Sequence, residues 1–239
     1  MLVKRLLRLS VSMLVVVFIS SIIAFPVTNA ADNFRYIEEV TILEKLYLYE
    51  PYIHAFSNPH GAYIDRQSAL VRLYKFFGIT EHLQITDAEA DLVLDKYTDK
   101  KDIAVWSKKV IAHAVKKGIL KGVSTKEIAP QGYFNEKMLC TLILRQIGYE
   151  LKNGDYENAV TILKEKGSIS ENEVKIFHNK NLICDDFVGI LYDSLNAQCP
   201  DNQRLIDKFI NEYKIINKEK AIEEGLIDKE GSLIRYHSH

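Results

Sequence analysis

One pattern occurs twice in the chain, at a constant offset of 70 residues. The first copy, residues 64–78, reads IDRQSALVRLYKFFG, and the second, residues 134–148, reads FNEKMLCTLILRQIG. Each copy begins with a residue that commonly caps a helix, Asp65 or Asn135. Apolar residues follow at helical spacing, and a glycine comes where a helix can end in the left-handed conformation. The pattern predicts the same helix twice, as part of a unit that buries its apolar face against other units.

A third and weaker copy spans residues 183–196 and reads ICDDFVGILYDSLN. Asn196 stands where the glycines stood, and asparagine is the next most common residue at that helix end. Ile183 is a poor cap, so the sequence leaves the start of this helix open. Its expected apolar face comprises Phe187, Ile190, Leu191 and Leu195.

Each of these three segments follows another segment with helical periodicity. The best formed begins near Trp106 and stops at Gly118, the third stops at Gly167, and the first has no glycine stop. Residues 86–97 and 201–216 have helical periodicity as well. Because no long alternating strand pattern occurs, we expect an all-α fold of three helix–loop–helix repeats. Their expected bounds are residues 31–82, 83–152 and 153–239, the last with a C-terminal helical segment.

The first thirty residues have a different composition from the rest. Lys4, Arg5 and Arg8 precede an uncharged run, and small residues at 28–30 stand where a signal peptidase would cut. This is the pattern of a secretory signal peptide at residues 1–30. The run is also long enough for an uncleaved membrane anchor. In both cases we expect the remainder of the chain to work outside the cytoplasm.

Charge argues against a nucleic-acid partner. The chain has a formal net charge of −1, and losing residues 1–30 would remove three basic residues and no acidic one, leaving −4. Proteins that bind nucleic acid normally carry a basic excess. We therefore expect no nucleic-acid binding.

The three cysteines do not predict a disulfide framework. Cys140 lies in an apolar run and is most simply a core residue. Cys184 and Cys199 fall near opposite ends of one predicted helix, about 22 Å apart at 1.5 Å per residue. That separation is too large for a disulfide.

The second unit, residues 97–149, resembles a bacterial S-layer homology (SLH) repeat, and weaker copies occur at about 37–80 and 155–197. The resemblance lies in Tyr97-Thr98-Asp99, Trp106, Gly118-Ile119, Gly122, Ala129-Pro130 and the closing residues 144–148. It implies a pseudo-threefold bundle in which three repeats share a helical centre. It also implies attachment to a secondary cell-wall polysaccharide, often one that bears a pyruvate ketal.

Members of this family commonly open the second helix with a Thr-Arg-Ala-Glu-type motif whose arginine reaches the anionic sugar. Arg66 holds that position in the first copy, and a guanidinium can bind a carboxylate in bidentate fashion. The resemblance also makes Trp106 a candidate for flanking the groove, although an aromatic residue at a helix start is more often part of the core. Glu136 and Cys184 occupy the arginine position in the other copies. These two polymer sites should therefore be disabled.

Other chemistries find little support in the sequence. The acidic run that starts at Asp87 lacks the glycine and the final glutamate of a calcium loop, with Leu92 and Thr98 in their places. No nucleophile–base motif is recognisable, and we expect neither metal nor cofactor. The sequence predicts a secreted, non-catalytic protein of the bacterial cell wall that binds a secondary wall polymer.

The alternative is a degenerate module that binds an envelope protein or serves in envelope assembly. In either case, membrane contact is expected only through an uncleaved N-terminal segment.

Overall fold

The computed structural model describes residues 34–50, 52–53, 56–57, 61–152, 154–178 and 180–236. The signal-peptide prediction for residues 1–30 lies outside them. From Phe34 onward the chain forms one compact unit.

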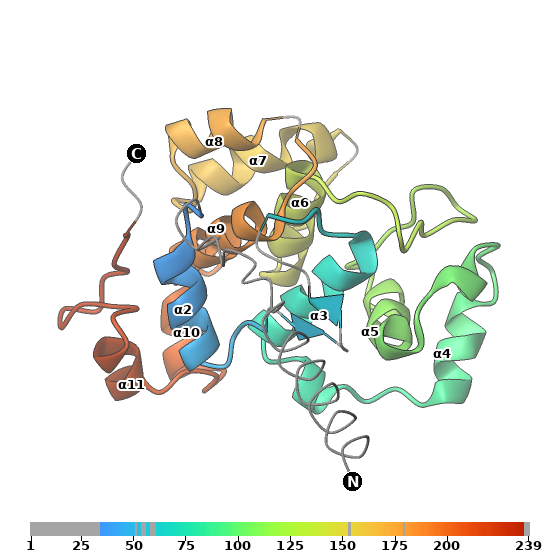
Figure 1. Ribbon diagram of the computed structural model, residues 1–239, viewed down its shortest axis with the longest axis horizontal. Helices are drawn as coiled ribbons and strands as arrows, with labels where there is room; N and C mark the ends of the chain where they lie inside the picture. The colour runs from blue at the N-terminus through green and yellow to red at the C-terminus, as the bar shows by residue number, and fades with distance from the viewer. Residues whose placement is uncertain are drawn as a thin grey trace, which may run out of the picture. The chain divides into compact units, whose positions relative to one another are not determined.

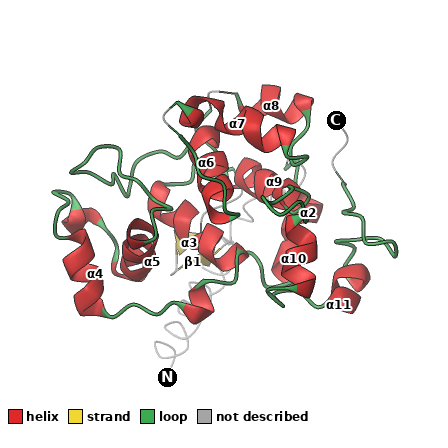
Figure 2. Ribbon diagram, turned by 180° about the vertical axis from the view of Figure 1, so that it is seen from behind, coloured by secondary structure: helices red, strands yellow, loops and turns green. Residues whose placement is uncertain are grey.

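The regular secondary structure of the described residues is almost entirely α-helix, which confirms the all-α prediction (Figures 1 and 2). A short antiparallel hairpin of β1 (Tyr52–Ile53) and β2 (Phe56–Ser57) adds two-residue strands, and 3-10 turns lie at Thr80–His82 and Lys100–Asp102. The helices are α2 (Ile37–Lys45), α3 (Arg66–Phe76), α4 (Asp87–Leu94), α5 (Val105–Lys116), α6 (Glu136–Gln146), α7 (Asp155–Glu165), α8 (Glu171–Phe177), α9 (Cys184–Ser194), α10 (Leu205–Asn211) and α11 (Lys218–Glu223).

Helices α3, α6 and α9 lie at the centre and are largely buried. Each packs against one of the outer helices: α3 against α5, α6 against α7, and α9 against α2. The last of these pairs joins α9, in the C-terminal third of the chain, to α2, the first described helix. In Figure 1 the outer helices accordingly extend away from the centre in three directions.

The segments that lead into the three central helices form a closed ring. Each makes one antiparallel bridge to each of the other two: Tyr63 with Ile183, Asp65 with Tyr133, and Asn135 with Asn181. Between these positions, Ile64, Phe134 and Leu182 are buried. The ring therefore closes one end of the central bundle with apolar side chains turned inward. As with the helix pairs, each of the three bridges joins a different pair of chain segments.

The predicted helix ends are confirmed in the two strong copies. Asp65 accepts a hydrogen bond from the Ser68 N–H at 2.7 Å, and Asn135 accepts one from the Met138 N–H at 2.9 Å. Gly78 and Gly148 have φ of 65° and 102°, the left-handed region that glycine enters readily. The third helix starts after Ile183 without a side-chain cap.

Two predictions about the C-terminal part were wrong. The helix expected over 201–216 runs only over α10, because Lys214 turns into a left-handed conformation with φ of 56° and Ile216 then enters the core. The single helix expected to hold both Cys184 and Cys199 ends at Ser194. Cys199 lies in a turn before Pro200, and a residue before proline disfavours helix. All three cysteines are buried and free.

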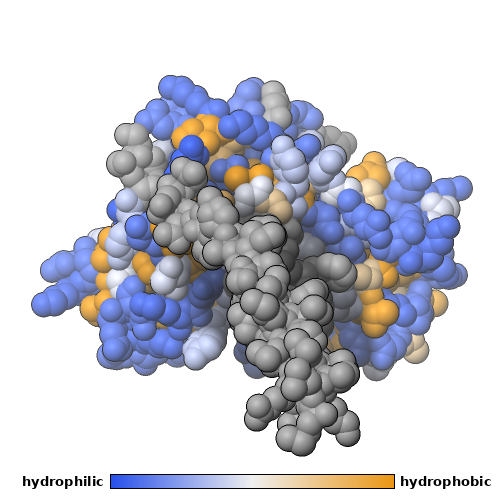
Figure 3. All heavy atoms as spheres, in the orientation of Figure 1, coloured by the Kyte–Doolittle hydropathy of each residue, from blue (hydrophilic) through white to orange (hydrophobic). Residues whose placement is uncertain are grey.

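The surface is mainly hydrophilic on the face in Figure 3, with scattered apolar residues. Several large exposed side chains are tyrosines. Among them, Tyr63 and Tyr133 are 59% and 64% exposed, and their rings meet edge to face with centroids 5.6 Å apart. This pair marks the outer side of the ring of bridges.

Candidate functional site

Arg66 is the first residue of α3, and the helix start is bound to a loop of the next unit. The Arg66 N–H donates to the Gly132 carbonyl at 3.1 Å, and the Gln67 N–H donates to the Pro130 carbonyl at 2.9 Å. The Gln67 side chain in turn accepts from the Ala104 N–H and the Ser107 hydroxyl, at 3.0 and 2.9 Å, at the start of α5. The start of α3 is therefore held by two segments of the chain, the loop at residues 130–132 and the start of α5.

The loop over residues 128–132 is held by Asp99, the aspartate of the Tyr-Thr-Asp stretch. Its carboxylate accepts from the Ile128 N–H at 3.0 Å and from the Ala129 N–H at 2.6 Å. Gly132 allows the loop to pass against the arginine, because a Cβ there would lie 3.2 Å from the Ala129 carbonyl oxygen and 3.4 Å from Arg66 Cδ. Asp99 and Gly132 together fix the surface on which Arg66 rests.

The Arg66 side chain is 7% exposed, yet it has no ion pair within the described part of the chain. Its Nε donates to the Ile128 carbonyl at 2.9 Å, and one terminal nitrogen lies 3.0 Å from the sulfur of Met138. Burial lowers the pKa of Arg66. The Asp99 carboxylate and Tyr156 act on the guanidinium without forming an ion pair with it. A desolvated guanidinium without a paired carboxylate retains capacity to bind an anion.

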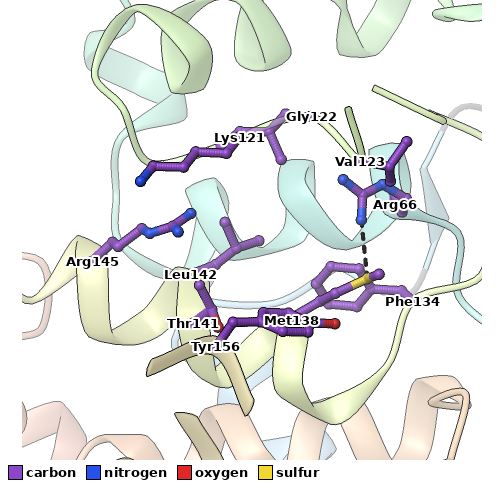
Figure 4. A pocket seen from close by; sticks show the side chains of 11 residues that line it. Arg66, Lys121, Gly122, Val123, Phe134, Met138, Thr141, Leu142, Arg145 and Tyr156 are labelled. Atoms are coloured by element: carbon purple, nitrogen blue, oxygen red, sulfur yellow. Dashed lines mark hydrogen bonds between the residues drawn. The ribbon is translucent and has the colours of Figure 1, made fainter. Parts of the chain in front are cut away.

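Arg66 forms part of the wall of a pocket of about 430 Å³ (Figure 4). None of the lining residues is acidic. Its apolar surface comes from Leu120, Val123, Phe134, Met138 and Leu142, and its polar groups from Arg66, Lys121, Thr141, Arg145 and Tyr156. An apolar pocket with a few convergent polar groups is typical of a ligand site, and here the charges are all positive.

Two further cations face this pocket. Arg145, on α6, is half-buried and donates to the Ile119 carbonyl at 2.9 Å, and burial lowers its pKa. Lys121 is exposed. In the described structure, no carboxylate forms an ion pair with either side chain, whereas Arg204 and Arg235 pair with Asp207 and Asp193. Lys121 and Arg145 belong to no motif that predicts an anion site, since only the folded chain brings them to the Arg66 pocket.

Trp106 is not part of this pocket. It is half-buried at the second position of α5. The two residues that the resemblance selected are thus not brought together on one cavity surface.

The residues at the arginine position in the other copies are both deeply buried. Glu136 is 1% exposed and Cys184 fully buried, and burial raises the pKa of the Cys184 thiol. Neither supplies a positive charge.

The described residues contain no group of three side chains that could hold a metal ion. None of their helices has the length and apolar character needed to cross a membrane.

In comparisons with known proteins, no family model matches the chain, and no curated protein or solved structure matches it.

Proposed function

We propose that this protein is a non-catalytic component of the bacterial cell envelope that attaches to an anionic wall polysaccharide through the Arg66 pocket. The observation that carries the proposal is the Arg66 guanidinium, 7% exposed and without an ion pair in the described structure, at the wall of a pocket with no acidic lining. A saccharide carboxylate would supply the charge that the site lacks. The secretory pattern of residues 1–30 and the SLH-like repeat agree with this location.

The shape of the pocket suits a sugar. Val123 and Met138 offer exposed apolar surface for the C–H face of a ring, and the Tyr156 hydroxyl can exchange hydrogen bonds with the hydroxyls of the sugar. The pyruvate ketal that the resemblance implies carries one carboxylate. It is the substituent we assign to Arg66.

The test is co-sedimentation of the purified protein with protein-free walls from the cells that produce it. We expect binding to intact walls and strongly reduced binding to walls from which ketal pyruvate has been removed enzymatically. Equal binding to both preparations would refute the ketal as the ligand, and no binding to either would refute wall attachment.

A second candidate function is favoured by the exposed Tyr63–Tyr133 pair. Exposed tyrosines are frequent at protein interfaces, and the loss of the arginine in two copies would suit a module that has changed ligand. In this case the protein would bind an envelope protein and not the wall. Replacing both tyrosines with serine should then abolish recovery of that partner from envelope extracts, while Arg66→Met should leave it unchanged.

A further inference from the structure

The three cations of the Arg66 pocket occupy two separate places. In Figure 4 the ends of Lys121 and Arg145 approach each other at one side of the pocket, and Arg66 lies at the other side over Phe134 and Met138. The side chain of Leu142 lies between these groups.

The spacing follows from the geometry of α6. Met138, which contacts Arg66, and Arg145 are seven residues apart, so they lie on the same face of the helix, two turns apart. At 1.5 Å per residue this is about 10 Å along the helix axis. One carboxylate or phosphate cannot contact cations at both ends. A single pyranose ring is also shorter than this span.

We infer that the pocket binds a saccharide segment with anionic groups on two different sugar units, one held by Arg66 and the other by Lys121 and Arg145. The inference rests on the proposed wall-polymer function and adds the ligand's length and charge pattern. The anionic group at Lys121 and Arg145 is a carboxylate or a phosphate, because both present the oxygens that lysine and arginine bind. The apolar surface at Leu142 would contact the sugar between them.

The two ends differ in how they are built. Arg66 is nearly buried and held by the Ile128 carbonyl, which favours one planar group in a fixed orientation. At the other end, Lys121 is exposed and Arg145 half-buried, so their side chains can adapt to the substituent. We expect the Arg66 end to select the chemical group. The other end should add affinity that depends on chain length.

The experiment measures the affinity of the purified protein for fragments of the wall polymer, released enzymatically and separated by length. Isothermal titration calorimetry compares one-unit fragments that carry one anionic group with longer fragments that carry two. The test variant is Lys121→Ala with Arg145→Ala. Its matched control is Lys101→Ala with Lys229→Ala, which removes the same charge from exposed positions outside the pocket.

We expect the test variant to weaken binding of the two-anion fragments about tenfold or more, as for the loss of a hydrogen-bonded charge. Binding of the one-anion fragments should not change. Arg66→Met should weaken both, and the control neither. Because Arg145 also contacts the Ile119 carbonyl, Lys121→Glu serves as a second test variant, and it should likewise weaken only the longer fragments.

An equal loss for both fragment lengths, or no loss for either, would overturn the second anion site while leaving the wall-polymer function in place. If the unaltered protein binds neither fragments nor walls, the proposed function itself fails and this inference fails with it.

Discussion

At the scale of single residues, Arg66 lies in surroundings that are costly for a charge. Its guanidinium is nearly buried, and its close polar contacts are one carbonyl oxygen and one sulfur atom. The Asp99 carboxylate acts on it without forming an ion pair, and burying a charge without an ion pair lowers stability. A residue that lowers stability in this way is typical of binding sites, where activity and stability compete. The conflict supports a ligand role for Arg66.

Replacing Arg66 with methionine should separate stability from function. The change removes the desolvated charge, which favours folding, and two hydrogen bonds, to the Ile128 carbonyl and the Met138 sulfur, which disfavours it. Because most of the side-chain volume is kept, we expect the free energy of unfolding to change by less than about 1 kcal/mol. Urea denaturation measures it. A loss of several kcal/mol would show that Arg66 serves the fold.

The neighbouring residue is the matched comparison. Gln67 is also buried, but its side-chain oxygen accepts two hydrogen bonds from the start of α5. We expect Gln67→Ala to lower the free energy of unfolding by about 2 kcal/mol, because the Ala104 N–H and the Ser107 hydroxyl lose an acceptor. If Gln67→Ala lowered the free energy of unfolding by less than Arg66→Met does, the structural role of Gln67 and the ligand role of Arg66 would be contradicted.

At the scale of elements, helix ends decide where the chain turns back. Gly78 and Gly118 both have left-handed φ, at 65° and 71°. They differ in surroundings: a Cβ on Gly78 would lie 3.1 Å from Ile215, whereas one on Gly118 would meet no atom within 4 Å. Helix ends and caps are local properties, so the sequence predicted them for α3 and α6. The shorter α10 was missed, because the turn at Lys214 depends on burying Ile216.

Replacing each of the two glycines with alanine should separate the cost of backbone strain from the cost of a steric contact. Gly118→Ala should lower the free energy of unfolding by about 1 kcal/mol through backbone strain alone. Gly78→Ala should cost more, because Ile215 must also move. Thermal unfolding of both variants gives the comparison, and an equal cost would refute the contact with Ile215.

The pair α3–α5 also carries a titratable contact. The Tyr74 hydroxyl and His113 Nδ1 lie 3.1 Å apart, and burial, followed by the charges of Lys117 and Lys116, lowers the pKa of His113. The unfolded chain therefore binds a proton more readily, so stability should fall as pH drops below the ordinary histidine pKa of about 6.5. The free energy of unfolding, measured by chemical denaturation, should fall less between pH 7 and 5.5 in the His113→Gln variant than in the unaltered protein. An identical fall in the two proteins would contradict a role for His113.

At the scale of the whole molecule, the described chain closes on itself through α9 and α2. Asp185 on α9 accepts hydrogen bonds from the Arg35 and Tyr36 N–H groups, at 3.0 and 3.1 Å, just before α2. Gln67 makes the corresponding contact between α3 and α5. The SLH resemblance implied a pseudo-threefold bundle with a shared helical centre, but neither it nor the periodicity predicted this order of helix pairs, because the order depends on contacts between residues about 150 positions apart. For the same reason, Arg66 is the one residue of this pocket that the sequence predicted as a binding residue.

Removing the contact between Asp185 and the start of α2 should destabilise the whole folded part of the chain. We expect Asp185→Ala to lower the free energy of unfolding by about 3 kcal/mol while unfolding stays a single transition, since two backbone donors lose a charged acceptor. Asp186→Asn is the control: burial raises the pKa of Asp186, so a neutral side chain should not destabilise. Two separate transitions in the Asp185 variant would show that the units fold independently.

The central claim, that Arg66 binds an anionic group of the wall polymer, is tested most directly by the affinity of the Arg66→Met variant for protein-free walls. Quantitative co-sedimentation should show binding by the unaltered protein, at least a tenfold loss for Arg66→Met, and no loss for the Lys101→Ala/Lys229→Ala control. Wall binding by a folded Arg66→Met protein at the affinity of the unaltered protein would contradict the account.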